Sequence, residues 1–121
     1  MPIFRSALPA LLIFLAITAT AMAHHGWSGY DSDKTLNLTG TIMESGYDNP
    51  HAFVKLKVAG EHAKIWTAIL APPSRMQARG LERDALKAGA TATVVGYPSR
   101  TNPDELRAER ITINGKTTEL R

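Results

Sequence analysis

The sequence contains no cysteine, which excludes disulfide bonds, thiolate metal ligands and cysteine nucleophiles. A large charge of one sign is also missing, since 14 lysine and arginine residues are interspersed with 11 carboxylates. This mild excess does not predict a polyanionic partner such as nucleic acid. No uninterrupted apolar run approaches the roughly 20 residues that span a bilayer. The protein must therefore derive its stability from packing or from a bound ligand.

The N-terminus has the features of an export signal. Arg5 supplies a positive charge, residues 11–17 form an apolar run, and Ala21-Met22-Ala23 has the small residues that signal peptidase requires. We therefore expect residues 1–23 to be a cleaved signal peptide. Cleavage leaves a periplasmic protein with no stable membrane anchor and places a free amine on His24.

The remaining chain is long enough for one small domain. Residues 28–34 consist mostly of Gly, Ser, Asp and Tyr and show no apolar period. We therefore expect an N-terminal arm over residues 24–35. The domain itself is expected over residues 36–121.

Apolar and polar residues alternate with the period of β-strands through most of the domain. Five strands are expected, followed by a terminal hairpin at Asn114-Gly115: residues 36–42, 52–58, 64–70, 90–97 and 106–113. Gly40 is expected to mark a bend or bulge in the first strand. Val54, Leu56 and Ile69 are expected to point inward.

The alternation is interrupted between the third and fourth strands. Ser74 and Gln77 have the spacing of a capping box, and Gly80 supplies a left-handed stop, which together predict a helix of about two turns. This order predicts a mainly β fold, a small five-stranded Greek-key barrel of the oligonucleotide/oligosaccharide-binding (OB) type with a short helix between strands three and four. A half-open sheet with one packed helix is the alternative.

Histidines are the candidate neutral nitrogen ligands among the side chains: His24, His25, His51 and His62. His51 follows Pro50 in the loop between the first two strands, which in OB barrels commonly rims the ligand face. It is interpreted either as a metal ligand or as a turn residue that donates to a backbone carbonyl. His62 lies in a hairpin connection, where a solvated side chain is expected.

An N-terminal amine beside imidazoles favours copper(II), which heads the affinity order of divalent metals and accepts square-planar nitrogen sets. Zinc usually requires further firm ligands, and no cysteine is present to supply them. The sequence allows two alternative ligand sets for copper. One is a brace made by the amine and imidazole of His24 with His51, and the other is a local site made by the amine with the amide nitrogen and imidazole of His25. A polar terminus that binds no metal is the third possibility.

The aromatic and basic residues give weaker signals. Trp27, beside the histidines, is expected either to dock the terminus at the barrel end or to shield a metal. The arginines are interpreted as a solvated face paired with neighbouring carboxylates: Arg75, Arg79, Arg83, Arg100, Arg107 and Arg110. No nucleophile–base pair, phosphate-binding loop or paired-carboxylate spacing occurs, so an enzyme is not expected.

Several motifs are specific in combination: HHGWSGYD at 24–31, NPH at 49–51, APPSRM at 71–76, GYPSR at 96–100 and LRAERI at 106–111. With them the chain resembles an uncharacterised family of small exported bacterial proteins classed as a domain of unknown function. The resemblance implies a periplasmic location and brings no established activity. The family's histidine pair and Asn-Pro-His element correspond to His24, His25 and His51, and the terminus also resembles that of histidine-brace copper proteins. The chain departs from the family at Ala88, where a turn-forming proline is expected.

The leading hypothesis from the sequence is a non-enzymatic periplasmic protein that binds copper(II) at its processed N-terminus, for storage, delivery or assembly. Its metal ligands would be His24, His25 and His51. The alternative is a metal-free OB-like interaction module that binds a small ligand, a glycan or a protein partner. Neither hypothesis involves nucleic acid, and the sequence does not predict an oligomeric state.

Overall fold

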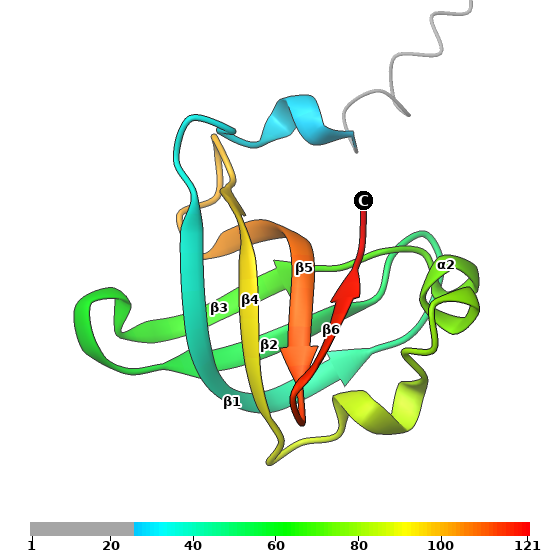
Figure 1. The fold of residues 1–121 in the computed structure, drawn as a ribbon. Coiled ribbons are helices and arrows are strands. Elements are labelled where there is room, and N and C mark those ends of the chain that lie inside the picture. The colour runs from blue at the N-terminus through cyan, green and yellow to red at the C-terminus, as the bar shows by residue number, and fades with distance from the viewer. Residues whose placement is uncertain (1–25) are drawn as a thin grey trace, which may run out of the picture.

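The computed structural model describes residues 26–121. The expected signal peptide and the candidate ligands His24 and His25 lie outside these residues. Within them, strands alternate with short helical segments (Figure 1). The strands are β1 (Leu36–Gly46), β2 (Phe53–Val58), β3 (Lys64–Ile69), β4 (Thr91–Pro98), β5 (Glu105–Ile113) and β6 (Lys116–Glu119). The α-helix is α2 (Pro73–Ala78), and the 3-10 segments are η1 (Trp27–Gly29), η2 (Gly60–His62) and η3 (Arg83–Leu86).

The strands close into a barrel. β1 pairs antiparallel with both β2 and β4, β2 pairs with β3, and β4 pairs with β5. A parallel pairing of residues 67–69 in β3 with residues 105–107 in β5 joins the two ends of the sheet. β6 extends β5 as a hairpin, and α2 lies between β3 and β4 in the chain. The predicted five-stranded OB-like barrel with a short helix after the third strand is confirmed.

β1 is longer than expected, because a bulge at Met43 lets the strand bend and continue to Gly46. Its first half pairs with β4 and its second half with β2, so that one strand serves both sides of the barrel. The irregularity expected at Gly40 lies at Met43 instead. A Cβ at Gly40 would collide with the carbonyl oxygen of Lys57, so this glycine permits a close approach of two backbones.

α2 begins before its expected cap. Pro72 occupies the N-cap position with no side-chain hydrogen bond, and Pro73 is the first helical residue, where the fixed φ of proline favours a helix start. The predicted capping box of Ser74 and Gln77 is therefore wrong. Gly80 has a φ of 80°, which confirms the predicted left-handed stop. None of the helices within residues 26–121 has the length and apolar content to cross a membrane.

The inward face of each strand fills the barrel. In β2, Val54 and Leu56 are fully buried while Lys55 is exposed, as the alternation predicts. In β3, Ala68 is buried and Ile69 is half-buried, so alternation places Ile69 on the outer face. Its predicted inward position is wrong.

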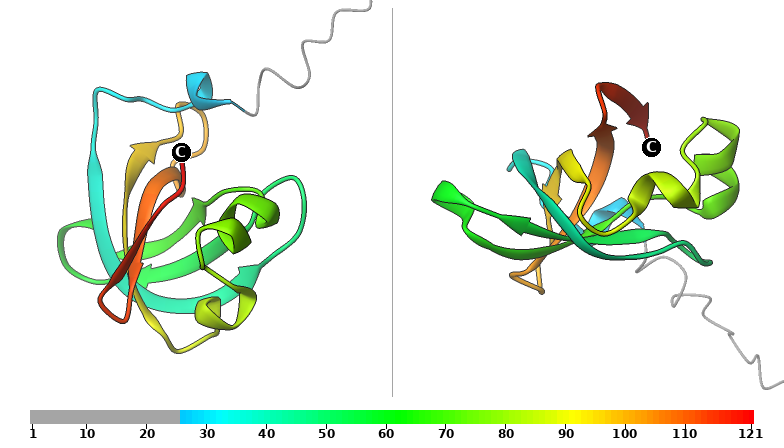
Figure 2. Two further views of the ribbon diagram at one scale, coloured as in Figure 1. Left: turned by 45° about the vertical axis from the view of Figure 1, so that its right-hand side comes forward. Right: turned by 90° about the horizontal axis from the view of Figure 1, so that it is seen from below.

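The N-terminal arm is docked across one end of the barrel (Figures 1 and 2). A β-bridge joins Tyr30 to Ser99, and the backbone N–H of Asp31 donates to the carbonyl oxygen of Pro98 at 2.9 Å. These bonds hold the arm on the end of β4 and on the loop that leads to β5. The arm therefore covers part of the outer face of the barrel.

Candidate functional site

Two cavities lie between the docked arm and the outer face of the barrel. The first, the tyrosine cavity, has a volume of about 400 Å³ and is lined by Gly29, Tyr30, Pro50, His51, Ile69, Ser99, Thr101, Glu105 and Arg107. The second, the tryptophan cavity, has a volume of about 500 Å³ and is lined by Gly26, Trp27, Pro50, His51, Pro72, Arg75 and Arg107. Pro50, His51 and Arg107 line both cavities, so that they form a shared wall.

The tyrosine cavity occupies the position of the ligand face in OB barrels. Pro50 and His51 belong to the β1–β2 loop, and Ser99 and Thr101 belong to the β4–β5 loop. OB folds commonly bind ligands with these two loops. The topology thus creates a hollow at the place where the fold class predicts binding.

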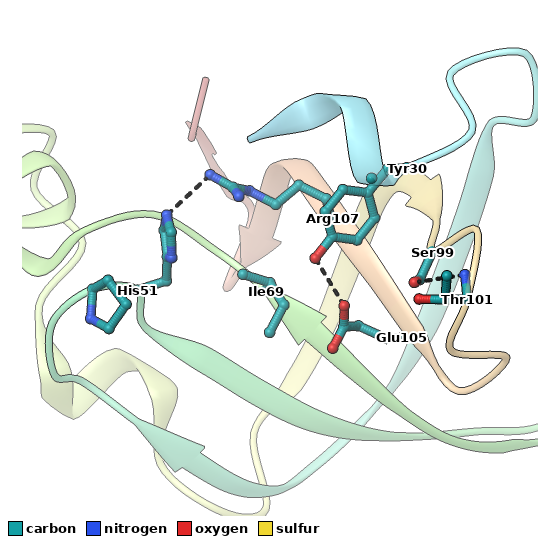
Figure 3. A pocket seen from close by; sticks show the side chains of 9 residues that line it. Tyr30, His51, Ile69, Ser99, Thr101, Glu105 and Arg107 are labelled. Atoms are coloured by element: carbon teal, nitrogen blue, oxygen red, sulfur yellow. Dashed lines mark hydrogen bonds between the residues drawn. The ribbon is translucent and has the colours of Figure 1, made fainter. Parts of the chain in front are cut away.

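A contact between Arg107 and His51 forms the shared wall (Figure 3). Nη2 of the guanidinium lies 3.3 Å from Nε2 of His51. Because a guanidinium only donates, this contact is a hydrogen bond in which Nε2 of His51 is the acceptor. His51, interpreted from the sequence as a ligand or a turn residue, is thus the acceptor for an arginine.

Arg107 is 5% exposed, and its predicted place on a solvated face is therefore wrong. Its neighbours Leu106 and Ala108 are fully buried, so alternation along β5 directs the arginine to the outer face. There the arm covers it, with the guanidinium carbon 4.8 Å from the centre of the Trp27 ring. Burial lowers the pKa of Arg107, and the positive charge of Arg75 lowers it further. The burial depends on a distant segment, so the local sequence around Arg107 carries no signal for it.

Among residues 26–121, Trp27 contacts two guanidinium groups and one aromatic ring. In addition to Arg107, the guanidinium carbon of Arg121 lies 4.6 Å from the centre of the indole. The ring of Tyr97 meets it edge-on, with the ring centres 6.0 Å apart. Contacts of this kind stabilise an aromatic residue at a partly desolvated site. They place Trp27 against β4, β5 and the C-terminal residue, and its expected roles of docking the terminus or shielding a metal stay predictions.

Tyr30 links the arm to β5 across the tyrosine cavity. Its hydroxyl donates to Oε2 of Glu105 at 2.8 Å (Figure 3). Burial raises the pKa of Tyr30, and the hydrogen bond to Glu105 raises it further, because only the protonated phenol makes this bond. Tyr30 is therefore a hydrogen-bond donor throughout the neutral pH range. The local sequence gives no signal for this role, since Tyr30 lies in a segment without any periodic pattern.

Of the predicted metal ligands, His51 lies within the described residues and lines both cavities. His24 and His25 lie outside the described residues, so their place in the site stays a prediction. Within residues 26–121, no group of three or more His, Asp or Glu side chains could hold a metal ion. His62 is exposed in η2, as expected for a solvated side chain.

Comparisons with known proteins identify a family and a shared fold. Residues 12–107 match a family described as a family of unknown function, DUF6152. No curated protein matches the chain. The crystal structure of TiaS in complex with a transfer RNA and ATP has a TM-score of 0.50 and 17% identity over 76% of this chain. The structure of the ZRD-deleted mutant of TiaS in complex with agmatine has a TM-score of 0.51 and 15% identity over 74% of this chain.

The chain spans 20% and 27% of the length of these two structures. At identities this low, the structural likeness shows a common fold and no more. A fold shared by unrelated sequences does not assign an activity. The function must therefore be argued from the residues of the site.

Proposed function

Because the chain belongs to the family of unknown function DUF6152, which carries no assigned activity, we propose a function from the site itself: non-enzymatic binding of copper(II) in the periplasm. The ligands are His24, with its free amine, His25 and His51. The resemblance of the terminus to that of histidine-brace proteins supports this set. Storage, delivery or assembly of copper is the corresponding role.

The observation that carries the proposal is that Gly26 and His51 line the same cavity. Gly26 directly follows His25 in the sequence, so the described chain begins at the cavity that His51 lines. Consecutive Cα atoms are about 3.8 Å apart across a trans peptide. This spacing supports a site shared by the processed terminus and His51.

The chemistry of the ligands also supports copper. An α-amine titrates near pH 7.7 and an imidazole near pH 6.5, so a metal displaces their protons at small cost near neutral pH. Amine and imidazole nitrogens suit the square-planar geometry of copper(II).

The hydrogen bond from Arg107 competes with metal binding at His51. The lone pair of His51 Nε2 accepts from Arg107, so coordination through this nitrogen replaces that hydrogen bond. The positive charge of Arg107 also opposes the approach of a second cation. A brace that includes His51 therefore moves Arg107, whereas a local site at His24 and His25 leaves the contact intact.

Calorimetric titration of copper into the metal-free mature protein tests the proposal. The variants are His51→Ala, His62→Ala as its matched control, and a form with one extra residue before His24. The extra residue blocks the amine and should weaken binding strongly in either site. His51→Ala should weaken binding by about tenfold or more if His51 is a ligand, whereas His62→Ala should leave the affinity unchanged.

The outcomes separate the possible sites. Loss in the extended form with unchanged binding in His51→Ala assigns copper to the local site at His24 and His25. Unchanged binding in every form, or none in any form, removes the terminus from the function. A brace that includes His51 should also raise the melting temperature with copper, because the metal then binds the folded state preferentially.

The alternative is a metal-free OB-like module that binds a small ligand, a glycan or a protein partner. The tyrosine cavity, which both the β1–β2 and the β4–β5 loops line, supports a small ligand, because OB folds bind through these loops. This alternative predicts ligand binding that survives blocking of the N-terminal amine.

A further inference from the structure

The polar groups of the tryptophan cavity are almost all hydrogen-bond donors. Its polar side chains are Trp27, His51, Arg75 and Arg107, and among residues 26–121 no Asp or Glu lines it. Guanidinium groups and the indole N–H only donate hydrogen bonds. The lone pair of His51 Nε2 accepts from Arg107. A ligand that carries hydrogen-bond acceptors therefore complements these side chains.

Two positive charges face the same space. Arg107 is buried; this burial lowers its pKa, the positive charge of Arg75 also lowers it, and the charge of Glu105 opposes the shift. Arg75 is exposed, so water screens part of the repulsion between the two charges, and an anion between them reduces it further. A carboxylate fits best, because its two oxygens match the parallel N–H groups of a guanidinium.

The other walls of the cavity are apolar. Pro50, Pro72 and Trp27 line it, and such residues suit a carbon skeleton rather than a fully hydrated ion. The volume of about 500 Å³ also lies in the range of cavities that hold organic ligands.

We propose that the tryptophan cavity binds a small organic carboxylate, with the carboxylate between Arg75 and Arg107 and the carbon skeleton against Trp27 and Pro72. The site goes beyond copper binding and does not require the N-terminal amine. It names the ligand class for the metal-free alternative. Because it needs no metal, its failure and the failure of copper binding are separate results.

α2 offers a matched pair of arginines for the test. Arg75 Nη1 donates to the carbonyl oxygen of Leu120 at 3.0 Å, and Arg79 Nη1 donates to that of Glu119 at 2.6 Å. Both side chains therefore tie α2 to the C-terminal segment, but Arg75 lines the cavity and Arg79 does not. Arg75→Ala and Arg79→Ala should lose similar stability and differ in ligand binding.

The probe is malonate, titrated into protein freed of metal with a chelating resin, at constant ionic strength and in a buffer without carboxylate or phosphate. Binding is followed by the NMR shift of the Trp27 indole N–H. Malonamide has the same skeleton without charge, and inorganic phosphate has charge without a skeleton. Malonate should bind saturably, and both comparison probes should bind at least about tenfold more weakly. Arg75→Ala should weaken malonate binding by about tenfold, the loss of one charge-assisted hydrogen bond, whereas Arg79→Ala should change it less than about twofold.

Arg75→Lys keeps the positive charge, so it separates a loss of ligand binding from a folding defect in Arg75→Ala. An affinity between those of wild type and Arg75→Ala supports the proposal, and an affinity below that of Arg75→Ala contradicts it. The proposal is overturned if wild type shows no saturable binding of malonate, or if Arg75→Ala and Arg79→Ala weaken it equally. Tighter binding of phosphate than of malonate would also overturn it.

Discussion

Two strands of the barrel carry the same local pattern with opposite outcomes. In β2, Lys55 stands between two buried apolar residues, and its side chain is 46% exposed. In β5, Arg107 also stands between two buried apolar residues, yet it is 5% exposed. Alternation directs both cations away from the core. The strand pattern alone therefore does not decide whether an outward side chain meets water.

The segment that covers each outer face makes the difference. Over β2, Lys55 forms a surface ion pair with Glu44 at 3.4 Å. Over β5, Trp27 and Tyr30 of the arm lie against Arg107 and Glu105. A segment far away in the sequence thus turns one outer face into the wall of a cavity and leaves the other as ordinary surface.

Leu56 in β2 and Leu106 in β5 are both fully buried, so truncating either residue should have a similar effect on stability. Leu56→Ala and Leu106→Ala should each lower the free energy of unfolding by about 2–5 kcal/mol, because both side chains are fully buried and their removal leaves cavities. Urea denaturation measures both losses. Lys57→Ala, on the exposed face of β2, is the control and should stay within about 0.5 kcal/mol. A loss for Lys57→Ala as large as for Leu56→Ala would show that the register of β2 is wrong.

Arg107 and Lys55 both point outward, but only Arg107 is buried, so removing each side chain should have a different effect on stability. Arg107→Ala should lower the free energy of unfolding by about 1–3 kcal/mol, because it removes a hydrogen bond to His51 and the packing on Trp27. Lys55→Ala should cost about 0.5 kcal/mol or less, since it loses an exposed ion pair. Both values come from urea denaturation at one salt concentration. Equal losses would show that the burial of Arg107 under the arm adds no stability beyond that of an exposed ion pair.

The sequence predicted the parts of the fold that depend on local chemistry. Alternation located the five barrel strands, and Asn114-Gly115 located the last hairpin, where both residues have positive φ values of 52° and 76°. The left-handed stop at Gly80 depends on its own backbone and was also predicted. These features require no knowledge of distant segments.

The features that were missed depend on contacts across the chain. Ile69 was placed inward and Arg107 on a solvated face, although both line the tyrosine cavity. The docking of the arm on the β4–β5 loop creates this cavity, and no periodic pattern in the arm predicts that docking. The sequence correctly places His51 in the β1–β2 loop, but it gives no signal for the bond to Arg107. The roles of His24 and His25 stay predictions.

Tyr30→Phe tests the link between the arm and β5 with the smallest change. It removes the hydroxyl that donates to Glu105 and should cost about 0.5–1.5 kcal/mol of unfolding free energy at neutral pH. Burial and this hydrogen bond raise the pKa of Tyr30 above its ordinary value of 10.0, so the folded state holds the proton more tightly than the unfolded state. The contribution to stability is complete below about pH 10 and is lost as the pH rises through the folded-state pKa.

Wild type should therefore lose stability above about pH 10, and Tyr30→Phe should lose less over the same range. Tyr97→Phe is the matched control, because the hydroxyl of Tyr97 donates to Glu109 at 2.7 Å and the pKa of Tyr97 is also raised, first by that hydrogen bond. Both variants should reduce the alkaline loss of stability. At neutral pH, Tyr30→Phe alone should accelerate hydrogen exchange of the Asp31 amide, which bonds to Pro98. Equal exchange in the two variants would show that Trp27 holds the arm without Tyr30, and the contrast between β5 and β2 would then depend on the tryptophan.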